Sequence, residues 1–295
     1  MWVRLGDAPV HARRTWGLLA TLICMSTSSV AFIGGGSMAS ALIGGLLRSG
    51  RSAASLVVVE PAAVQRAKLE ASFGVQAQAA ADERLSGAAT VVWAVKPQYF
   101  ADAARPCAPY ITQALQVSVM AGVRSASIAS ASGSPRVVRT MPNTPALICR
   151  GIAGLYARDG VNAQERAEVE ALFAPTGATL WVDREDELDA VTAVSGSGPA
   201  YVFYVLEALM QADTELGLSL EQGRRLALAT FDGATALAAA SSETPEALRA
   251  QVTSKGGTTH AAITVLDELG VKAAFVRALH AARTRAAELG REFGG

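Results

Sequence analysis

The run "VAFIGGGSMASA", residues Val30 to Ala41, joins a short apolar segment to a glycine-rich turn. The apolar residues before Gly34 predict a buried strand, and "SALIGGLLRSG" (residues 40–50) has the apolar spacing of a helix that stops at Gly50. A strand that passes through glycines into a helix is the opening unit of a nucleotide-binding α/β domain. This stretch therefore predicts both the fold class and a first ligand site.

The alternation of strand and helix continues to about Leu188. Apolar, β-branched runs predict further strands at residues 55–60, 90–95, 117–122, 136–141, 152–157 and 179–182. Such strands, alternating with helices, are typical of a parallel sheet that is covered on both faces. Beyond Leu188 only helical spacing is found. We therefore expect a Rossmann-like parallel-sheet domain over residues 30–188 and an all-α domain over residues 189–295.

The all-α domain is predicted to contain helices at residues 199–217, 221–240, 246–252, 260–269 and 271–289. Ser197 and Gly198 are expected to cap the first of these, with Pro199 at its first helical position. Its apolar face would comprise Val202, Val205, Leu206, Leu209 and Met210. The second helix is apolar on most faces, so we expect Leu226, Leu228 and Phe231 to be buried against a second subunit.

The composition argues against several kinds of partner. Lys plus Arg and Asp plus Glu each number 26, so the formal net charge is zero. A neutral chain has no bulk attraction to nucleic acid or to a membrane surface, and no apolar run reaches the ~18 residues needed to span a bilayer. The three cysteines fit no metal or disulfide framework. They indicate free thiols in a reducing compartment, so we expect a cytoplasmic protein without a metal site.

Residues 1–29 do not share these patterns. Arg13 and Arg14 precede a short apolar run, Trp16 to Met25, which imitates a secretory signal. No small-x-small cleavage site leads from it into a plausible mature start, and the first strand begins at Val30. We therefore expect a disordered extension in which residues 1–24 are dispensable or absent from the native protein. A targeting peptide is the alternative.

The first glycine loop fits the pattern G-x-G-x-x-A over residues 34–39. Gly34 would permit the tight turn, Gly36 would let a pyrophosphate approach the backbone, and Ala39 would allow close helix–strand packing. Ser37 and Met38 then lie at a helix N-terminus, where unpaired N–H groups bind phosphate. A purely structural strand-to-helix turn is the alternative reading of this motif.

An acidic residue, Glu60, ends the second predicted strand. A carboxylate at that position accepts hydrogen bonds from the adenosine ribose and repels a 2′-phosphate, which favours NADH over NADPH. Arg66 lies nearby in the sequence and would partly offset the repulsion. The sequence therefore predicts a nicotinamide dinucleotide and leaves the choice between NADH and NADPH open.

Two further strand ends contribute to the predicted cofactor site. "AVKPQ" (residues 94–98) closes one strand, so Ala94, Lys96 and Pro97 are placed to line the cofactor. "MPNTPA" (residues 141–146) follows a later strand, and Asn143 in it can hydrogen-bond a ligand. In a doubly wound sheet, ligands bind outside the carboxyl ends of the strands, which is where these residues are expected.

A second glycine-rich loop, "SKGGTT" (residues 254–259), precedes the helix that is predicted to begin near His260. Its glycines, Gly256 and Gly257, free the backbone, and the first-turn N–H groups of a helix lack partners within the helix. Such a loop suits a carboxylate or a phosphate. An ordinary turn between helices with a threonine cap is the alternative.

Five segments together resemble the pyrroline-5-carboxylate reductases, the family that catalyses the last step of proline biosynthesis. They are "FIGGGSMASALIGGLL" (32–47), "AVKP" (94–97), "RTMPNTPA" (139–146), "VSGSGPAYVF" (194–203) and "VTSKGGTTHAAITVLD" (252–267). The resemblance runs from Val30 to about Leu289. Lys255 departs from it, because the family usually has proline there; a charge at this point would attract the substrate.

The resemblance implies a Rossmann-like domain followed by a helical dimerisation domain, and a homodimer or a larger ring of dimers. It also implies that hydride from NADPH or NADH reduces 1-pyrroline-5-carboxylate to proline. Residues matched to the family's cofactor site are Gly34, Gly36, Ser37, Met38, Lys96, Pro97 and Asn143. Those matched to its substrate site are Ser254, Gly257, Thr258 and Thr259, with Gly256 in the same loop.

The chemistry of a cyclic imine fits the lack of an obvious acid–base pair. The imine is substantially protonated near neutral pH, so the enzyme mainly supplies position and a polar partner for nitrogen. Thr259 can supply that hydroxyl, and it is the predicted catalytic residue. His260 is expected to lie on the first helical turn without a catalytic role.

Two other functions are compatible with the first glycine loop. Another small two-domain imine or 3-hydroxyacid reductase would typically carry a catalytic lysine on the interdomain helix, whereas residues 202–215 contain no lysine. A non-enzymatic nucleotide-sensing regulator would have no use for the second loop. Both alternatives therefore explain less of the sequence than the imine reductase does.

Overall fold

The computed structural model describes residues 28–293. The expected dispensable segment, residues 1–24, lies outside this range. The strands are β1 (Ser29–Ile33), β2 (Leu56–Val59), β3 (Ala88–Trp93), β4 (Leu115–Ser118), β5 (Val137–Met141), β6 (Gly151–Ala157) and β7 (Gly177–Trp181). They form one sheet in the order β2-β1-β3-β4-β5-β6-β7. All seven predicted strands are present, with ends shifted by a few residues.

The sheet is not parallel throughout. Strands β1 to β5 run parallel, whereas β6 is antiparallel to β5, and β7 runs parallel to β6. Only residues 142–150 connect β5 to β6. A parallel crossover needs a dozen or more residues, so this short connection reverses the chain direction. The expected all-parallel sheet is therefore wrong for its last two strands.

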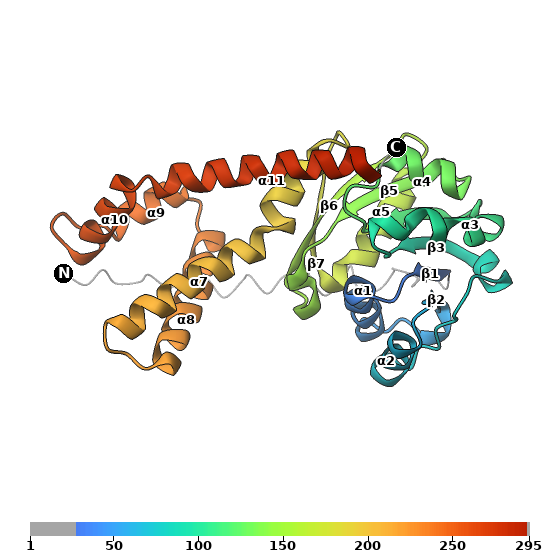
Figure 1. Ribbon diagram of the computed structural model, residues 1–295, viewed down its shortest axis with the longest axis horizontal. Coiled ribbons are helices and arrows are strands. Elements are labelled where there is room, and N and C mark those ends of the chain that lie inside the picture. The colour runs from blue at the N-terminus through green and yellow to red at the C-terminus, as the bar shows by residue number, and fades with distance from the viewer. Residues whose placement is uncertain (1–27, 294–295) are drawn as a thin grey trace, which may run out of the picture.

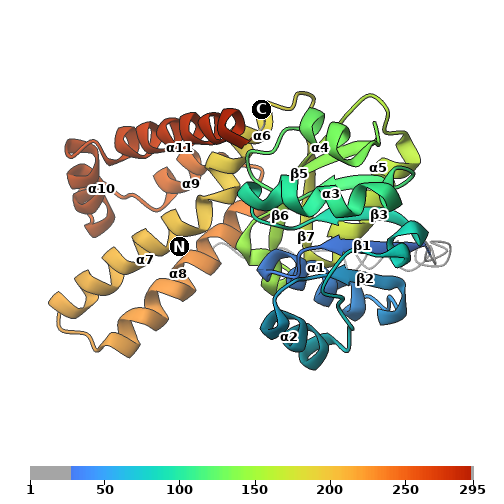
Figure 2. The ribbon, with the colours of Figure 1, turned by 45° about the vertical axis from the view of Figure 1, so that its right-hand side comes forward.

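Helices cover both faces of the sheet (Figures 1 and 2). They are α1 (Ser37–Arg48), α2 (Ala63–Phe73), α3 (Phe100–Ile111), α4 (Ser125–Ser132) and α5 (Ala163–Phe173). Leu42, Leu69 and Phe173 bring α1, α2 and α5 into the buried cluster on one face. Cys107 and Ile128 bring α3 and α4 into the cluster on the other. The Rossmann-like layering that was expected is thus confirmed.

The rest of the described chain is helical. It comprises α6 (Glu187–Val191), α7 (Gly198–Glu215), α8 (Leu220–Ala240), α9 (Pro245–Gln251), α10 (Thr258–Glu268) and α11 (Val271–Phe293). A π-helical turn, Thr192–Gly196, runs directly from α6 into α7. Ser197 has helical backbone angles and makes no side-chain cap. The side chain of Ser197 therefore does not cap α7 as expected, although α7 begins at Gly198, within one residue of its predicted start.

The helical part extends away from the sheet (Figure 1). The paired helices α7 and α8 form one arm, while α9 and α10 lie at the end of α11 that is remote from the sheet. The long helix α11 runs back to the sheet, where Leu289 approaches Gly122 and Gly290 approaches Arg124. A single chain thus leaves these helices largely without a core of their own.

Many apolar side chains of these helices are consequently exposed. Leu206 is buried, but Val202 and Leu209 of the predicted apolar face are 41% and 38% exposed. On α8, Leu226 and Leu228 are 53% and 42% exposed. Contiguous exposed apolar surface marks an interaction site. Within residues 28–293, no helix is long and apolar enough to cross a membrane.

Candidate active site

The first glycine loop lies between β1 and α1, at the carboxyl end of a central strand. Gly34 has a φ of +96°, and a Cβ there would lie 2.6 Å from the Ala94 carbonyl oxygen. Gly36 precedes the first turn of α1, and a Cβ there would meet no atom within 4 Å. The chain therefore needs glycine at 34 to pass β3, and at 36 it presents open backbone to the space outside.

The start of α1 suits an anion. Gly36 and Ser37 are exposed, Met38 is half-buried, and no side chain caps the helix N-terminus. The first turn carries no acidic residue. Unpaired N–H groups and the positive end of the helix dipole both favour a phosphate at this point. The geometry of residues 34–38 fits the pyrophosphate of a dinucleotide.

Glu60 lies at the end of β2 with its carboxylate over this loop. Its Oε2 accepts the Gly35 N–H at 2.8 Å, and its Oε1 accepts the Ala62 N–H at 2.8 Å. Gln65 on α2 donates to the Gly35 carbonyl oxygen at 2.5 Å. The carboxylate is thus fixed between the glycine loop and the start of α2, where sequence spacing placed it.

A cleft of about 630 Å³ opens outside the carboxyl ends of β1, β2 and β3. Of the predicted cofactor residues, it is lined by Gly34, Gly36, Glu60, Ala94 and Lys96. This is the point at which the strand order reverses, where doubly wound sheets bind their ligands. Pro97 begins the next turn beside Lys96.

The cleft also contains residues that sequence reasoning did not single out. Three consecutive alanines, Ala79, Ala80 and Ala81, line one side, and Tyr99 and Asp102 line another. The alanine segment runs along the edge of β2, where Gln78 pairs with Val59. Short-range patterns gave no signal for this placement, because it depends on how residues 75–81 return to the sheet.

Asn143, the predicted cofactor contact in the loop after β5, is held by hydrogen bonds on two sides. It is buried; its Nδ2 donates to the Ser195 carbonyl oxygen at 3.2 Å and its Oδ1 accepts the Ile152 N–H at 3.0 Å. It does not line the cleft. In this structure its amide therefore joins β6 to the π-helical turn.

The second glycine loop leads directly into α10. That helix begins at Thr258, two residues before the predicted start near His260. Gly256 has a φ of +77°, and the Gly257 N–H donates to the Ser254 carbonyl oxygen at 3.0 Å. No side chain caps α10 and its first turn has no acidic residue. Thr258 and Thr259 thus lie on a helical turn whose N–H groups are open to an anion.

The two loops do not meet within one chain. Figures 1 and 2 show α10 at the end of the helical part remote from the sheet, whereas α1 lies against the sheet. One chain therefore separates the predicted substrate residues, 254–259, from the cofactor cleft at Gly34 and Lys96.

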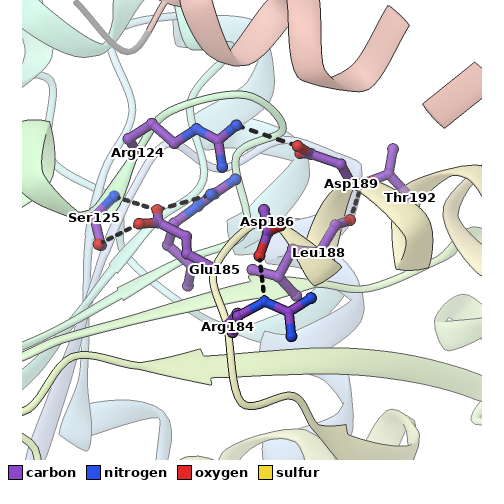
Figure 3. A network of polar contacts seen from close by, with 9 residues as sticks. Arg124, Ser125, Arg184, Glu185, Asp186, Leu188, Asp189 and Thr192 are labelled. Atoms are coloured by element: carbon purple, nitrogen blue, oxygen red, sulfur yellow. Dashed lines mark hydrogen bonds and ion pairs between the residues drawn. The ribbon is translucent and has the colours of Figure 1, made fainter. Parts of the chain in front are cut away.

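A cluster of ion pairs anchors the helical part on the sheet domain (Figure 3). The guanidinium of Arg139, a buried residue of β5, donates to Glu185 Oε1 at 2.8 Å. Glu185 also accepts the Ser125 N–H at 2.7 Å and hydroxyl at 2.9 Å. Arg124 pairs with Asp189 of α6 at 3.1 Å. These contacts fix the segment between β7 and α7 against α4 and β5.

The thiols and the acidic residues between positions 28 and 293 are not grouped as metal ligands. Cys107 is buried in α3, and burial raises its pKa to about 11, so its thiol is protonated at neutral pH. Cys149 is exposed and Cys24 lies outside the described range. Over residues 28–293, no group of three or more His, Cys, Asp or Glu side chains is placed to hold a metal ion.

Comparison with known proteins accounts for both parts of the chain. Residues 185–289 match the family model "Pyrroline-5-carboxylate reductase dimerisation", and residues 29–122 match "NADP oxidoreductase coenzyme F420-dependent". The pyrroline-5-carboxylate reductase of Pseudomonas aeruginosa is 44% identical, covering 92% of this chain and all of that protein. The chain belongs to the pyrroline-5-carboxylate reductase family. The resemblance seen in the five sequence segments is thereby confirmed.

Solved structures of the family share the fold. The pyrroline-5-carboxylate reductase of Coxiella burnetii has a TM-score of 0.82 at 35% identity and covers 89% of this chain and 98% of that one. The Plasmodium falciparum enzyme, solved with NADP bound, has a TM-score of 0.80 at 26% identity, with the same coverage. The expected order of a Rossmann-like domain and a helical domain is therefore a property of the family fold.

Proposed function

We propose that this chain reduces 1-pyrroline-5-carboxylate to L-proline with hydride from NADH or NADPH, as the last step of proline biosynthesis. Membership of the reductase family supports the reaction. The observation in the chain itself that supports it best is the pairing of two anion-binding helix starts, one at Gly36 beside the cofactor cleft and one at Gly257. The first suits a pyrophosphate and the second suits the carboxylate of a small substrate.

The reaction requires little acid–base chemistry from the protein. A reduced nicotinamide dinucleotide held by the glycine loop would supply the hydride for the carbon of the C=N bond, so that the protonated ring nitrogen would become the secondary amine of proline. The open N–H groups of Thr258 and Thr259 bind the substrate carboxylate, while the hydroxyl of Thr259 contacts the ring nitrogen. Holding the two reactants in line accounts for most of the rate in this type of reaction.

The functional unit that we propose is a homodimer in which each substrate loop serves the cofactor cleft of the other chain. The separation of α10 from α1 in one chain supports this arrangement (Figure 1). The exposed apolar residues of α7 and α8, such as Phe203 and Leu226, provide the surface for association. We also propose a cytoplasmic location, which free thiols such as Cys149 support.

A direct assay tests the reaction. Purified protein is mixed with 1-pyrroline-5-carboxylate and NADH or NADPH, and both the loss of reduced cofactor and the formation of proline are measured. We expect one molecule of proline to form for each molecule of NADH or NADPH that is oxidised. Turnover of a 3-hydroxyacid or another imine, with no proline formed from 1-pyrroline-5-carboxylate, would contradict the assignment.

Complementation tests the shared site. Gly36→Val blocks the open backbone at the cofactor loop, and Thr259→Val removes the hydroxyl of the substrate loop. If the site is shared, a mixed dimer contains one cleft and one loop that are both intact, so activity exceeds that of either variant alone. If the activity of the mixture is only the average of the activities of the two variants, each site lies within one chain.

A further inference from the structure

The adenosine end of the cofactor cleft has a charge distribution that bears on which dinucleotide it accepts. Two carboxylates line the cleft, those of Glu60 and Asp102. Lys96 is the only basic residue among those that line it, counted over residues 28–293. Lys96 follows the end of β3, next to Ala94, which the glycine loop approaches at Gly34. Lys96 therefore comes from the end of the strand that the glycine loop approaches.

Glu60 is held in the orientation needed to accept a ribose. Its two oxygens accept N–H groups from Gly35 and Ala62, both at 2.8 Å, which fixes the carboxylate beside the glycine loop. A carboxylate has about four acceptor positions, so two remain for ribose hydroxyls. A dianionic phosphate at the same place would face the carboxylate at short range, and the two like charges would repel each other.

Arg66 is a candidate to neutralise such a phosphate, but its guanidinium is bound to backbone carbonyl oxygens. Its Nη1 donates to the carbonyl oxygens of Glu60 at 2.9 Å and Pro61 at 2.7 Å. It lines a separate hollow on α2 together with Glu70 and Gln76, not the cofactor cleft. In this arrangement it stabilises the turn after β2 and leaves the 2′ position of the ribose without a cation.

One side of the cleft is small and apolar. Ala79, Ala80 and Ala81 offer methyl groups, which suit the face of an adenine ring and provide no partner for a phosphate. We propose that this reductase selects NADH over NADPH, and that Glu60 makes the selection by accepting the 2′-hydroxyl of the adenosine ribose. The proposal rests on the proposed function and assigns to that site a cofactor class without a 2′-phosphate.

Steady-state kinetics with both cofactors test the selection. The ratio of kcat/KM for NADPH to that for NADH is compared in the wild type, Glu60→Ser and Glu60→Gln. We expect the wild type to favour NADH and Glu60→Ser to raise the ratio roughly tenfold, which corresponds to about 1.4 kcal/mol. Glu60→Gln keeps the shape and removes the charge, so it should also raise the ratio. Glu70→Gln, a carboxylate of the other hollow, is the matched control and should leave it unchanged.

Two results would overturn the proposal. A wild type that prefers NADPH, with a further loss of NADPH efficiency in Arg66→Gln, would show that Arg66 turns to the 2′-phosphate. Equal losses with both cofactors in the Glu60 variants would show that Glu60 only holds the glycine loop. Thermal melting of each variant separates that outcome from unfolding.

Fluorescence titration of NADH and NADPH without substrate separates this proposal from the reaction itself. Binding of the reduced dinucleotide does not require 1-pyrroline-5-carboxylate. If NADH binds more tightly and Glu60→Ser shifts the preference, the selection holds even where the assay for proline fails. The contrary result is that proline forms while NADH and NADPH bind with equal affinity and Glu60→Ser leaves the ratio of these affinities unchanged. That result would support the proposed reaction and contradict the selection by Glu60.

Discussion

The amide of Asn143 connects two segments of the chain through Ser195. Asn143 Nδ2 donates to the Ser195 carbonyl oxygen at 3.2 Å, and its Oδ1 accepts the Ile152 N–H at 3.0 Å. Ser195 belongs to the π-helical turn, Thr192–Gly196, that leads into α7. One side chain thus links the loop after β5, the start of β6 and the beginning of the helical arm.

Replacing Asn143 by Ala should destabilise the fold by about 1–3 kcal/mol, because the part-buried Ile152 N–H and Ser195 carbonyl oxygen each lose a partner. Urea unfolding of Asn143→Ala and wild type measures the difference. The neighbouring Thr144→Ala, at an exposed position, serves as control and should stay within about 0.5 kcal/mol of wild type. An Asn143→Ala protein as stable as the control would show that the link carries little of the stability.

Glu185 should make stability depend on pH. Burial would raise the pKa of this carboxyl, but the Ser125 N–H and the Arg139 guanidinium outweigh burial and hold its pKa below the ordinary value. A depressed pKa in the folded state gives stability that is fully present above the ordinary pKa. That stability is lost as the pH falls through the pKa of the folded state.

The melting temperatures of wild type and Glu185→Gln therefore should differ most near neutral pH, with the wild type higher. The difference should narrow in acid, as Glu185 of the wild type takes up its proton. Thermal melts at a series of pH values measure this, with Glu70→Gln, an exposed carboxylate on α2, as control. A difference that stays constant from neutral to acid pH would contradict the role given to the charge.

The exposed apolar face of α8 should hold the dimer together. Leu226 is 53% exposed in a single chain. Placing a carboxylate there in both copies removes apolar burial of about 3 kcal/mol or more from a symmetric interface. We expect Leu226→Asp to weaken the dimer at least a hundredfold.

Sedimentation of Leu226→Asp over a range of concentrations measures this change. Val64→Asp is the matched control, since Val64 is 84% exposed but lies on α2 of the sheet domain. It should leave the association unchanged. A Leu226→Asp protein that sediments like the wild type at every concentration would place the interface elsewhere.

Thr259 should affect the rate more than the folding. Thr259→Val keeps the shape of the side chain and removes the hydroxyl expected to contact the substrate nitrogen. An unpaired buried partner costs roughly 1–3 kcal/mol, which corresponds to a loss of about 5- to 150-fold in kcat/KM. Cofactor affinity and melting temperature should change little, because the loop lies outside the core.

Thr264→Val is the control for Thr259→Val. It lies on the same helix, and its hydroxyl donates to the His260 carbonyl oxygen at 2.9 Å, within the helix. Its activity should remain near that of the wild type. If Thr259→Val keeps its efficiency within about twofold of the control, a difference of about 0.4 kcal/mol, Thr259 has only a structural role at the start of α10.

The sequence alone predicted the elements and the two loops, because both depend on neighbouring residues. Apolar periodicity located each strand and most helices, and Gly74 ends α2 in the left-handed conformation that glycine adopts easily. Strand–glycine–helix spacing likewise placed Gly34, Gly36 and Glu60 at one cleft. The expected side-chain cap at Ser197 failed, since the π-helical turn that leads from α6 to α7 has no short-range signature in the sequence.

Only the tertiary structure revealed relationships between residues far apart in the chain. The pairing of Arg139 with Glu185 and the return of residues 79–81 to the cleft depend on how whole elements pack. The reversal of β6 follows from the length of its connection to β5 rather than from its own residues. The separation of the two glycine loops could not be predicted either. Residues at the ends of a helix indicate where it begins and stops, but the direction in which it leaves the domain depends on tertiary packing.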